Sequence, residues 1–429
     1  MAIGQPTTSK RLATMRKSSW GRWLGIGALT LFGALLLSSM VPEIVANPAL
    51  LVQQLWIGLI NGAIIAIIAL GYTMVYGIIE LINFAHADVF MLGAFFTLIL
   101  LALMGITKST AGYLLYPALI VIFVTVSAAC AGINVTIERF TYRKLRNAPR
   151  LAPLISAIGV SFILQNVGLW LGGRDVYLGD RWSIVGIIAG LLTFAGTWQL
   201  ARRFRERQRW VWSLGTVASI GVFLGVRQLL QGLFPFKLGA NVMGNSAAGP
   251  KSVPNVLPSA NLLAPAGGTS LINISIRDII IVMLAFGLMI GLYLFVKNTR
   301  LGKAMRATAQ DRDAARLMGI NVDQTIMLTF LIGGALAGAA GVIFALFYGT
   351  VVFTLGFTQG LRAFTSAVLG GIGNIVGAML GGLLIGFLSA LSDTYLATSW
   401  TNALVFSILV IILVFRPSGL LGEDVQQKA

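Results

Sequence analysis

The sequence predicts an all-α polytopic membrane protein, with about 10–12 transmembrane helices of the length that a bilayer requires. Hydrophobic residues make up 57% of the chain and charged residues only 10%, whereas a soluble domain carries about 25% charged residues. Apolar runs of membrane-spanning length recur between short basic segments. The net charge of +17 is spread over these segments, so it indicates membrane orientation and no binding to nucleic acid.

The first 53 residues combine a basic tail with an apolar segment. Residues 1–22 contain bases and no acid, and residues 23–41 are long enough to span a membrane. A signal peptide cleaved near Val45 is the alternative, but the apolar part of such a peptide is usually shorter. We therefore expect 1–53 to be a tail followed by an extra, uncleaved anchor.

Further apolar windows predict the other spans. They are 54–79, 89–106, 113–135, 151–171, 183–200, 210–230, 278–296, 324–347 and 401–415. Residues 361–391 are too long for one span, and the glycine-rich break at 370–374 predicts a helical hairpin or a re-entrant segment. Arg416 and Pro417 end the last span.

The positions of the bases predict the topology. With the N-terminus inside, the inner loops 1–22, 136–150, 201–209 and 297–323 hold 21 of the 31 Lys and Arg residues, and the outer loops hold six. This bias predicts that the N-terminus is cytoplasmic. The C-terminus is cytoplasmic as well if residues 361–391 cross the membrane twice.

The chain then divides into consecutive parts. They are the anchor region 1–53, a first core part 54–182, an inserted pair of spans with an outer loop 183–277, a second core part 278–422, and a tail 423–429. We expect the segment 231–277 to be a plain, partly disordered outer loop; a lid over the outer mouth is the alternative.

The loop 297–323, here called the elbow, gathers six bases and three acids between two apolar segments. Residues 303–310 favour a helix by composition. Asp311 is suited to cap a second short helix, with Asp313 in its first turn. Gly319 stands where a left-handed C-cap is expected. The elbow is therefore predicted to project from the membrane domain as a surface for another protein.

The sequence lacks the motifs of an enzyme. It has no phosphate-binding G-x-x-x-x-G-K-[ST] loop, no nucleophile elbow, one histidine (His86) and one cysteine (Cys130). A histidine-based triad or metal cluster cannot be built from one histidine, and no cofactor is expected. If ATP energises this chain, another chain must hydrolyse it.

The run Asp313-Ala314-Ala315-x-x-x-Gly319 resembles the acidic-Ala-Ala-x-x-x-Gly core of the cytosolic loop in ABC importer permeases. The extended motif is missing, because no proline follows Thr329. An ordinary amphipathic loop is the alternative. The runs 71–95, 150–166, 341–351 and 364–386 resemble the branched-chain amino-acid ABC transporter permease family. The resemblance covers most of 54–172 and 278–422, and it implies that Asp311, Asp313, Ala314, Ala315 and Gly319 couple the chain to an ATPase.

The resemblance also implies partners and a location. The partners are cytosolic ABC ATPase subunits, a homologous second permease in a heterodimer, a periplasmic substrate-binding protein and membrane lipid, all in or at a bacterial inner membrane. The substrates are branched-chain or other neutral amino acids, with urea or amides as the alternative. An ion-coupled secondary transporter would need paired carboxylates deep in the spans, whereas Glu80, Asp88 and Asp278 fall at predicted ends. A passive channel would not need the elbow.

Five polar residues are candidates for the substrate path. Asn83 and His86, with Glu80 and Asp88, form a polar knot; we favour a solvated inner turn over a broken helix that lines the path. Gln165 and Asn166 either bind substrate or tie helices together. Asn374, in the glycine-rich break, has the same alternatives, and here we favour the path.

Overall fold

The computed structural model describes residues 38, 41–81, 83–108, 110–145, 148–149, 151–172, 220–222, 224–225, 248–263, 272–416 and 419–422. The expected anchor at 23–41 and the inserted spans at 183–200 and 210–230 lie almost wholly outside these residues. The corresponding predictions, and the number of 10–12 spans, therefore stay predictions.

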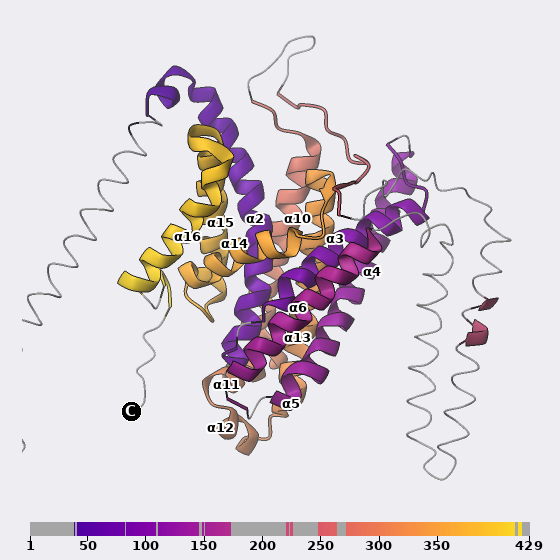
Figure 1. Cartoon of the computed structure of the whole chain (residues 1–429), viewed down its shortest axis with the longest axis vertical. Helices are drawn as coiled ribbons and strands as arrows, with labels where there is room; N and C mark the ends of the chain where they lie inside the picture. The colour runs from indigo at the N-terminus through magenta and orange to yellow at the C-terminus, as the bar shows by residue number, and fades with distance from the viewer. Residues whose placement is uncertain are drawn as a thin grey trace, which may run out of the picture.

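Within the described residues the chain forms a helical bundle (Figure 1). Its long helices are α2 (Pro48–Ile79), α3 (Ala85–Leu103), α4 (Gly112–Ile137), α6 (Leu151–Leu171), α10 (Ile276–Asn298), α13 (Val322–Tyr348), α14 (Leu355–Gly370), α15 (Ile375–Ser392) and α16 (Thr398–Phe415). Seven helical segments of the described chain are long and apolar enough to cross a membrane. The prediction of an all-α polytopic membrane protein is confirmed.

Shorter elements connect these helices. They are the π-helices η1 (Glu138–Tyr142) and η3 (Asp393–Ala397), the helices α5 (Arg143–Leu145), α11 (Arg300–Gln310) and α12 (Arg312–Leu317), and the strands β1 (Lys251–Ser252) and β2 (Thr350–Val351). The two strands pair antiparallel, with Lys251 opposite Val351.

Helix α2 forms the centre of the bundle and packs closely against α15. A Cβ added at Gly62 would lie 2.8 Å from the Leu383 Cα, and one at Gly386 would lie 2.2 Å from the Gly62 Cα. These distances are too short for a side chain, so the glycines are required for the approach of the two backbones. Helix α15 is therefore in direct backbone contact with α2, the most buried of the described spans.

Residues 361–391 form a helical hairpin, one of the two predicted alternatives. Helix α14 is joined to α15 by residues 371–374, where Gly371 and Gly373 have φ angles of 104° and 92°. Only glycine adopts such angles without strain. With 16 residues, α14 is about 24 Å long, shorter than the roughly 30 Å hydrocarbon core.

One end of the bundle, here called the elbow end, holds the elbow, the hairpin tip and the last described residues (Figure 1). Leu420 N donates to Leu369 O over 2.8 Å, at the end of α14. A Cβ added at Gly77, near the end of α2, would lie 3.3 Å from the Gly373 Cα. The elbow and residues 419–422 therefore lie at one end, in agreement with the predicted topology of these two segments.

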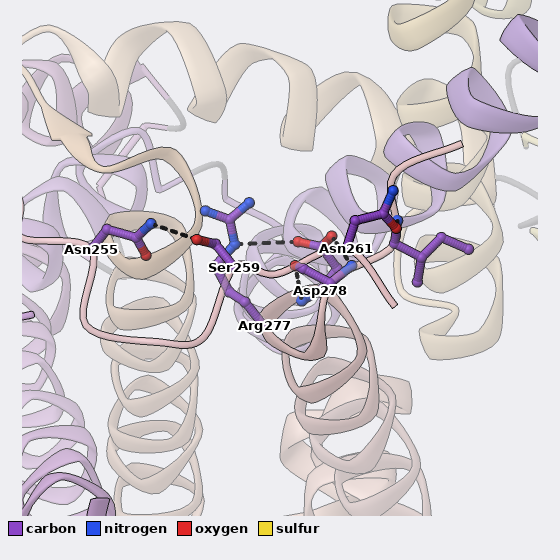
Figure 2. Close-up of polar contacts among 7 residues, drawn as sticks. Asn255, Ser259, Asn261, Arg277 and Asp278 are labelled. Carbon is purple, nitrogen blue, oxygen red and sulfur yellow. Dashed lines mark hydrogen bonds and ion pairs between the residues drawn. The ribbon is translucent and has the colours of Figure 1, made fainter. Parts of the chain in front are cut away.

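The opposite end, here called the strand end, carries part of the long loop before α10 (Figure 1). Figure 2 shows the polar contacts of this segment at the start of α10. Asn261 fastens this segment, because its amide donates to Ile272 O over 2.9 Å and accepts from Ile274 N over 3.2 Å. Ser275 and Asp278 form a capping box at the start of α10. The described residues 248–263 and 272–275 thus hold hydrogen bonds to one another and to the start of α10, and the choice between a plain outer loop and a lid stays a prediction.

Candidate functional site

The elbow has the local geometry that the sequence predicts. The Asp311 Oδ1 atom accepts hydrogen bonds from Asp313 N over 2.9 Å and Ala314 N over 3.0 Å. It therefore caps α12 and satisfies two of the backbone donors left free at a helix start. Gly319 follows with a φ of 82° and turns the chain back toward α13.

The exposure of the α12 side chains separates the predicted coupling residues into two kinds. Ala315 is only 3% exposed and packs inside the elbow, so its side chain is not on the surface that a partner would contact. Ala314 faces outward. Leu317 and Met318 are 89% and 83% exposed, and the sequence analysis missed this pair. The sequence signal that could have revealed this surface is the occurrence of two adjacent apolar residues in an otherwise charged loop.

Arg312, the first residue of α12, attaches the elbow to the bundle. Its Nη2 atom donates to the Ile78 carbonyl over 2.9 Å, in the last turn of α2. Glu80 then leaves the helix in the left-handed conformation, with a φ of 55°. A pocket of about 270 Å³ lies beside this contact and is lined by Tyr142, Thr308 and Gln310 among others.

The polar knot differs from the favoured interpretation. Asn83, His86 and Asp88 are 2%, 0% and 1% exposed, so the solvated inner turn was wrong for them, and only Glu80 faces outward. Asp88 also does not lie at an exposed span end. The reason is that α3 begins inside the bundle, against helices that are distant in sequence.

His86 shows how deep the knot lies. A Cβ added at Gly71 would lie 2.2 Å from its Nε2 atom, and Gly71 lies about 12 Å before the end of α2 at the helical rise per residue. The Tyr72 ring meets the imidazole edge-to-face, with ring centroids 4.9 Å apart. Neither imidazole nitrogen has a hydrogen-bond partner among the described residues.

The remaining knot residues connect four helices. Asn83 Nδ2 donates to Asn134 Oδ1 of α4 over 3.4 Å, and Asn134 Nδ2 donates to Phe330 O of α13 over 2.6 Å. The Ser161 hydroxyl of α6 donates to Asp88 of α3. The knot is therefore a junction of broken and continuous helices at membrane depth.

The comparisons with known proteins agree with this architecture. The family of branched-chain amino acid transport system permease components matches residues 54–414. The chain belongs to this family. It is 35% identical to the high-affinity branched-chain amino acid transport system permease protein LivH of Escherichia coli strain K12, over 88% of this chain and 97% of the relative. It is also 35% identical to the permease protein BraD of Pseudomonas aeruginosa, with the same coverage. No solved structure matches the chain.

In this permease the other predicted path residues lie apart from the knot or at its edge. Gln165 donates to the Ser161 hydroxyl over 3.3 Å and so extends the Asp88 contact. Asn166 is exposed and donates to Phe162 O of its own helix over 2.8 Å. Asn374 caps α15 by accepting from Gly377 N over 3.0 Å, and it donates to Leu421 O over 2.8 Å. The structure thus brings Asn83, His86 and Gln165 near Asp88 and keeps Asn166 and Asn374 elsewhere.

Proposed function

We propose that this permease is the membrane-spanning subunit of an ABC importer in a bacterial inner membrane, and that it carries branched-chain amino acids into the cytoplasm. The names of its relatives support this substrate class. Other neutral amino acids, urea and amides stay alternatives to be tested by competition. The partners are a separate ATPase, a homologous second permease in a heterodimer, and a periplasmic binding protein.

The elbow is the single observation that carries the coupling proposal. Leu317 and Met318 are two large apolar side chains that are almost fully exposed at the C-terminal end of α12. Side chains of this kind on a projecting surface commonly mark a protein interface. Asp313, with a side chain that is 88% exposed, adds charge at the positive end of the short helix. We infer that the outward face of α12 docks on the ATPase and that Asp311 and Gly319 hold its shape.

Two rivals from other classes have less support. An ion-coupled carrier would need paired carboxylates at membrane depth, whereas in the described knot Asp88 is the only buried acid and its partner is the Ser161 hydroxyl. A passive channel has no use for a projecting elbow with an exposed apolar pair.

Co-purification tests the coupling proposal. The tagged permease is expressed with its ATPase, and the double substitution Leu317→Asp and Met318→Asp is introduced. We expect the ATPase to be lost from the complex and the uptake of labelled leucine to stop, because both side chains are exposed and the fold does not need them. The double substitution Leu262→Asp and Leu263→Asp, at two half-exposed positions of the strand end, is the matched control and should retain the ATPase. Retention of the ATPase by the elbow variant would refute docking at α12.

Uptake measurements test the substrate. Cells that lack this chain should lose high-affinity uptake of labelled leucine, and valine and isoleucine should compete with leucine in the complemented strain. Competition by urea alone would replace the amino-acid assignment with the amide alternative.

A further inference from the structure

Large apolar side chains are exposed over much of the bundle, for example Ile120 of α4, Ile163 of α6 and Met283 of α10 at 65%, 62% and 70% exposure, as expected of surfaces in contact with lipid. Helices α14 and α16 also expose Phe357 and Trp400, at 61% and 66%. Among the helices α2, α13, α14, η3 and α16 there is nevertheless a group of polar residues, here called the outer polar patch. Its members are Asn61, Tyr348, Arg362, Asp393 and Asn402.

Contacts between helices hold the patch together. The Tyr348 hydroxyl donates to Asn61 Oδ1 over 2.7 Å. Asp393 accepts from the Thr401 hydroxyl, at the turn between α15 and α16. Asn61 lies roughly 27 Å from the elbow end of α2 at the helical rise per residue. The patch therefore extends from the interior of the spans toward the strand end.

Arg362 forms hydrogen bonds but no direct ion pair within the described part of the chain. Its Nε and Nη2 atoms donate to Asn402 Oδ1 over 3.2 Å and 2.9 Å. Both bonds go to one neutral oxygen, and no acid forms an ion pair with Arg362 in the described part of the chain. Ionisable groups in membrane spans usually pair with one another or line a path. The remaining donors of the planar guanidinium match the two oxygens of a carboxylate.

We propose that the outer polar patch is a binding site for an amino acid on the translocation path, in which Arg362 binds the α-carboxylate. This inference rests on the proposed function and names the group that the permease recognises. The patch itself then faces water or the second permease subunit, whereas the apolar faces of α4, α6 and α10 face lipid. Asp393 supplies a negative charge in the same patch for the α-ammonium group.

A substitution of Asn402 can distinguish this binding site from a purely structural hydrogen bond between α14 and α16. Asn402→Asp has nearly the same shape and would give the guanidinium an anionic partner. If the Arg362–Asn402 contact only joins helices, the new ion pair should strengthen it and leave ligand binding unchanged. If Arg362 binds a carboxylate, the added aspartate should compete with the substrate.

The experiment uses the purified permease–ATPase complex without binding protein, and equilibrium dialysis with labelled L-leucine. We expect binding that Arg362→Gln and Asn402→Asp each weaken about tenfold or more, the size of one lost charged hydrogen bond, and that Arg362→Lys weakens less. 4-Methylpentanoate, which keeps the carboxylate, should compete with leucine, and L-leucinamide, which lacks it, should not. Thermal unfolding in detergent checks that the variants are folded.

Several results would overturn the site and leave the proposed function standing. They are equal competition by L-leucinamide, unchanged or tighter binding in folded Asn402→Asp, and no binding of millimolar leucine by a wild-type complex that retains its ATPase. Loss of the ATPase from the complex would instead refute the proposed function.

Discussion

The guanidinium of Arg312 donates a hydrogen bond to the backbone carbonyl of Ile78, 2.9 Å away and 234 residues distant in sequence. The carbonyls of the last helical turn have no partner within the helix, and a cation there also compensates the helix dipole. The first residue of α12 thus caps the most buried helix of the bundle. A displacement of α12 must therefore either move the end of α2 or break this bond.

Arg312→Ala tests this connection. Bonds to charged groups contribute about 1.5–3 kcal/mol, and we expect uptake to fall about tenfold while the ATPase still co-purifies, because the exposed face of α12 is unchanged. Arg316→Ala is the control, since the Arg316–Asp313 pair is largely exposed and such pairs contribute little. Normal uptake by Arg312→Ala would show that movements of α12 are transmitted to the bundle through another contact.

Ala315→Glu should destabilise the elbow itself. The introduced glutamate side chain has no room at Ala315, which is 3% exposed. Overpacking a filled site costs about 1–3 kcal/mol even without a charge. Thermal unfolding in detergent should show a lower midpoint. Ala314→Glu, at the neighbouring exposed position, should change the midpoint little. Equal midpoints for the two variants would contradict the inward orientation of Ala315.

Gly71→Ala should destabilise the junction between α2 and α3. The added methyl group would lie 2.2 Å from His86 Nε2, so the imidazole must move, at a cost of about 1–3 kcal/mol. The double variant with His86→Ala should recover part of this loss, as a coupled pair does. Gly291→Ala meets nothing within 4 Å and should stabilise its helix by up to about 1 kcal/mol. Additive effects of Gly71→Ala and His86→Ala would argue against the contact.

Ser161→Ala should weaken the attachment of α6 to α3. It removes the hydroxyl that donates to Asp88 and leaves a buried carboxyl with one partner fewer, a loss of about 1–3 kcal/mol. Ser407→Ala is the control, because that hydroxyl is exposed and donates only to Ala403 O of its own helix. Unfolding midpoints in detergent compare the two, and a larger effect at Ser407 would be inconsistent with the junction.

Asn374→Ala should cost about 1 kcal/mol, the usual effect of losing a helix cap, and it should also release Leu421. Asn374→Ser keeps an oxygen that can accept from Gly377 N and should lose less stability. Uptake should follow stability in both variants. Complete loss of uptake in a stable Asn374→Ser protein would instead support a direct role of Asn374 in the substrate path.

Much of the fold was predictable because its signals are local. The spans α6 and α13 follow from apolar runs of membrane length, and the ends of the elbow helices follow from Asp311 and Gly319, whose effects act within a few residues. The hairpin at 371–374 follows from glycines that permit positive φ angles. The coupling role of the elbow residues was predicted from the resemblance to the permease family, and it is a proposal.

The sequence by itself determined the class of protein, the order of the described spans and the shape of the elbow. Only the tertiary structure decided that Ala315 and His86 are buried, that Arg312 caps α2 and that Arg362 meets a neutral Asn402. The physical reason is that lipid and protein interior are both apolar, so a span shows no polar face from which its buried side can be read. Which side is buried depends on helices that are far apart in the chain and meet only in the folded bundle.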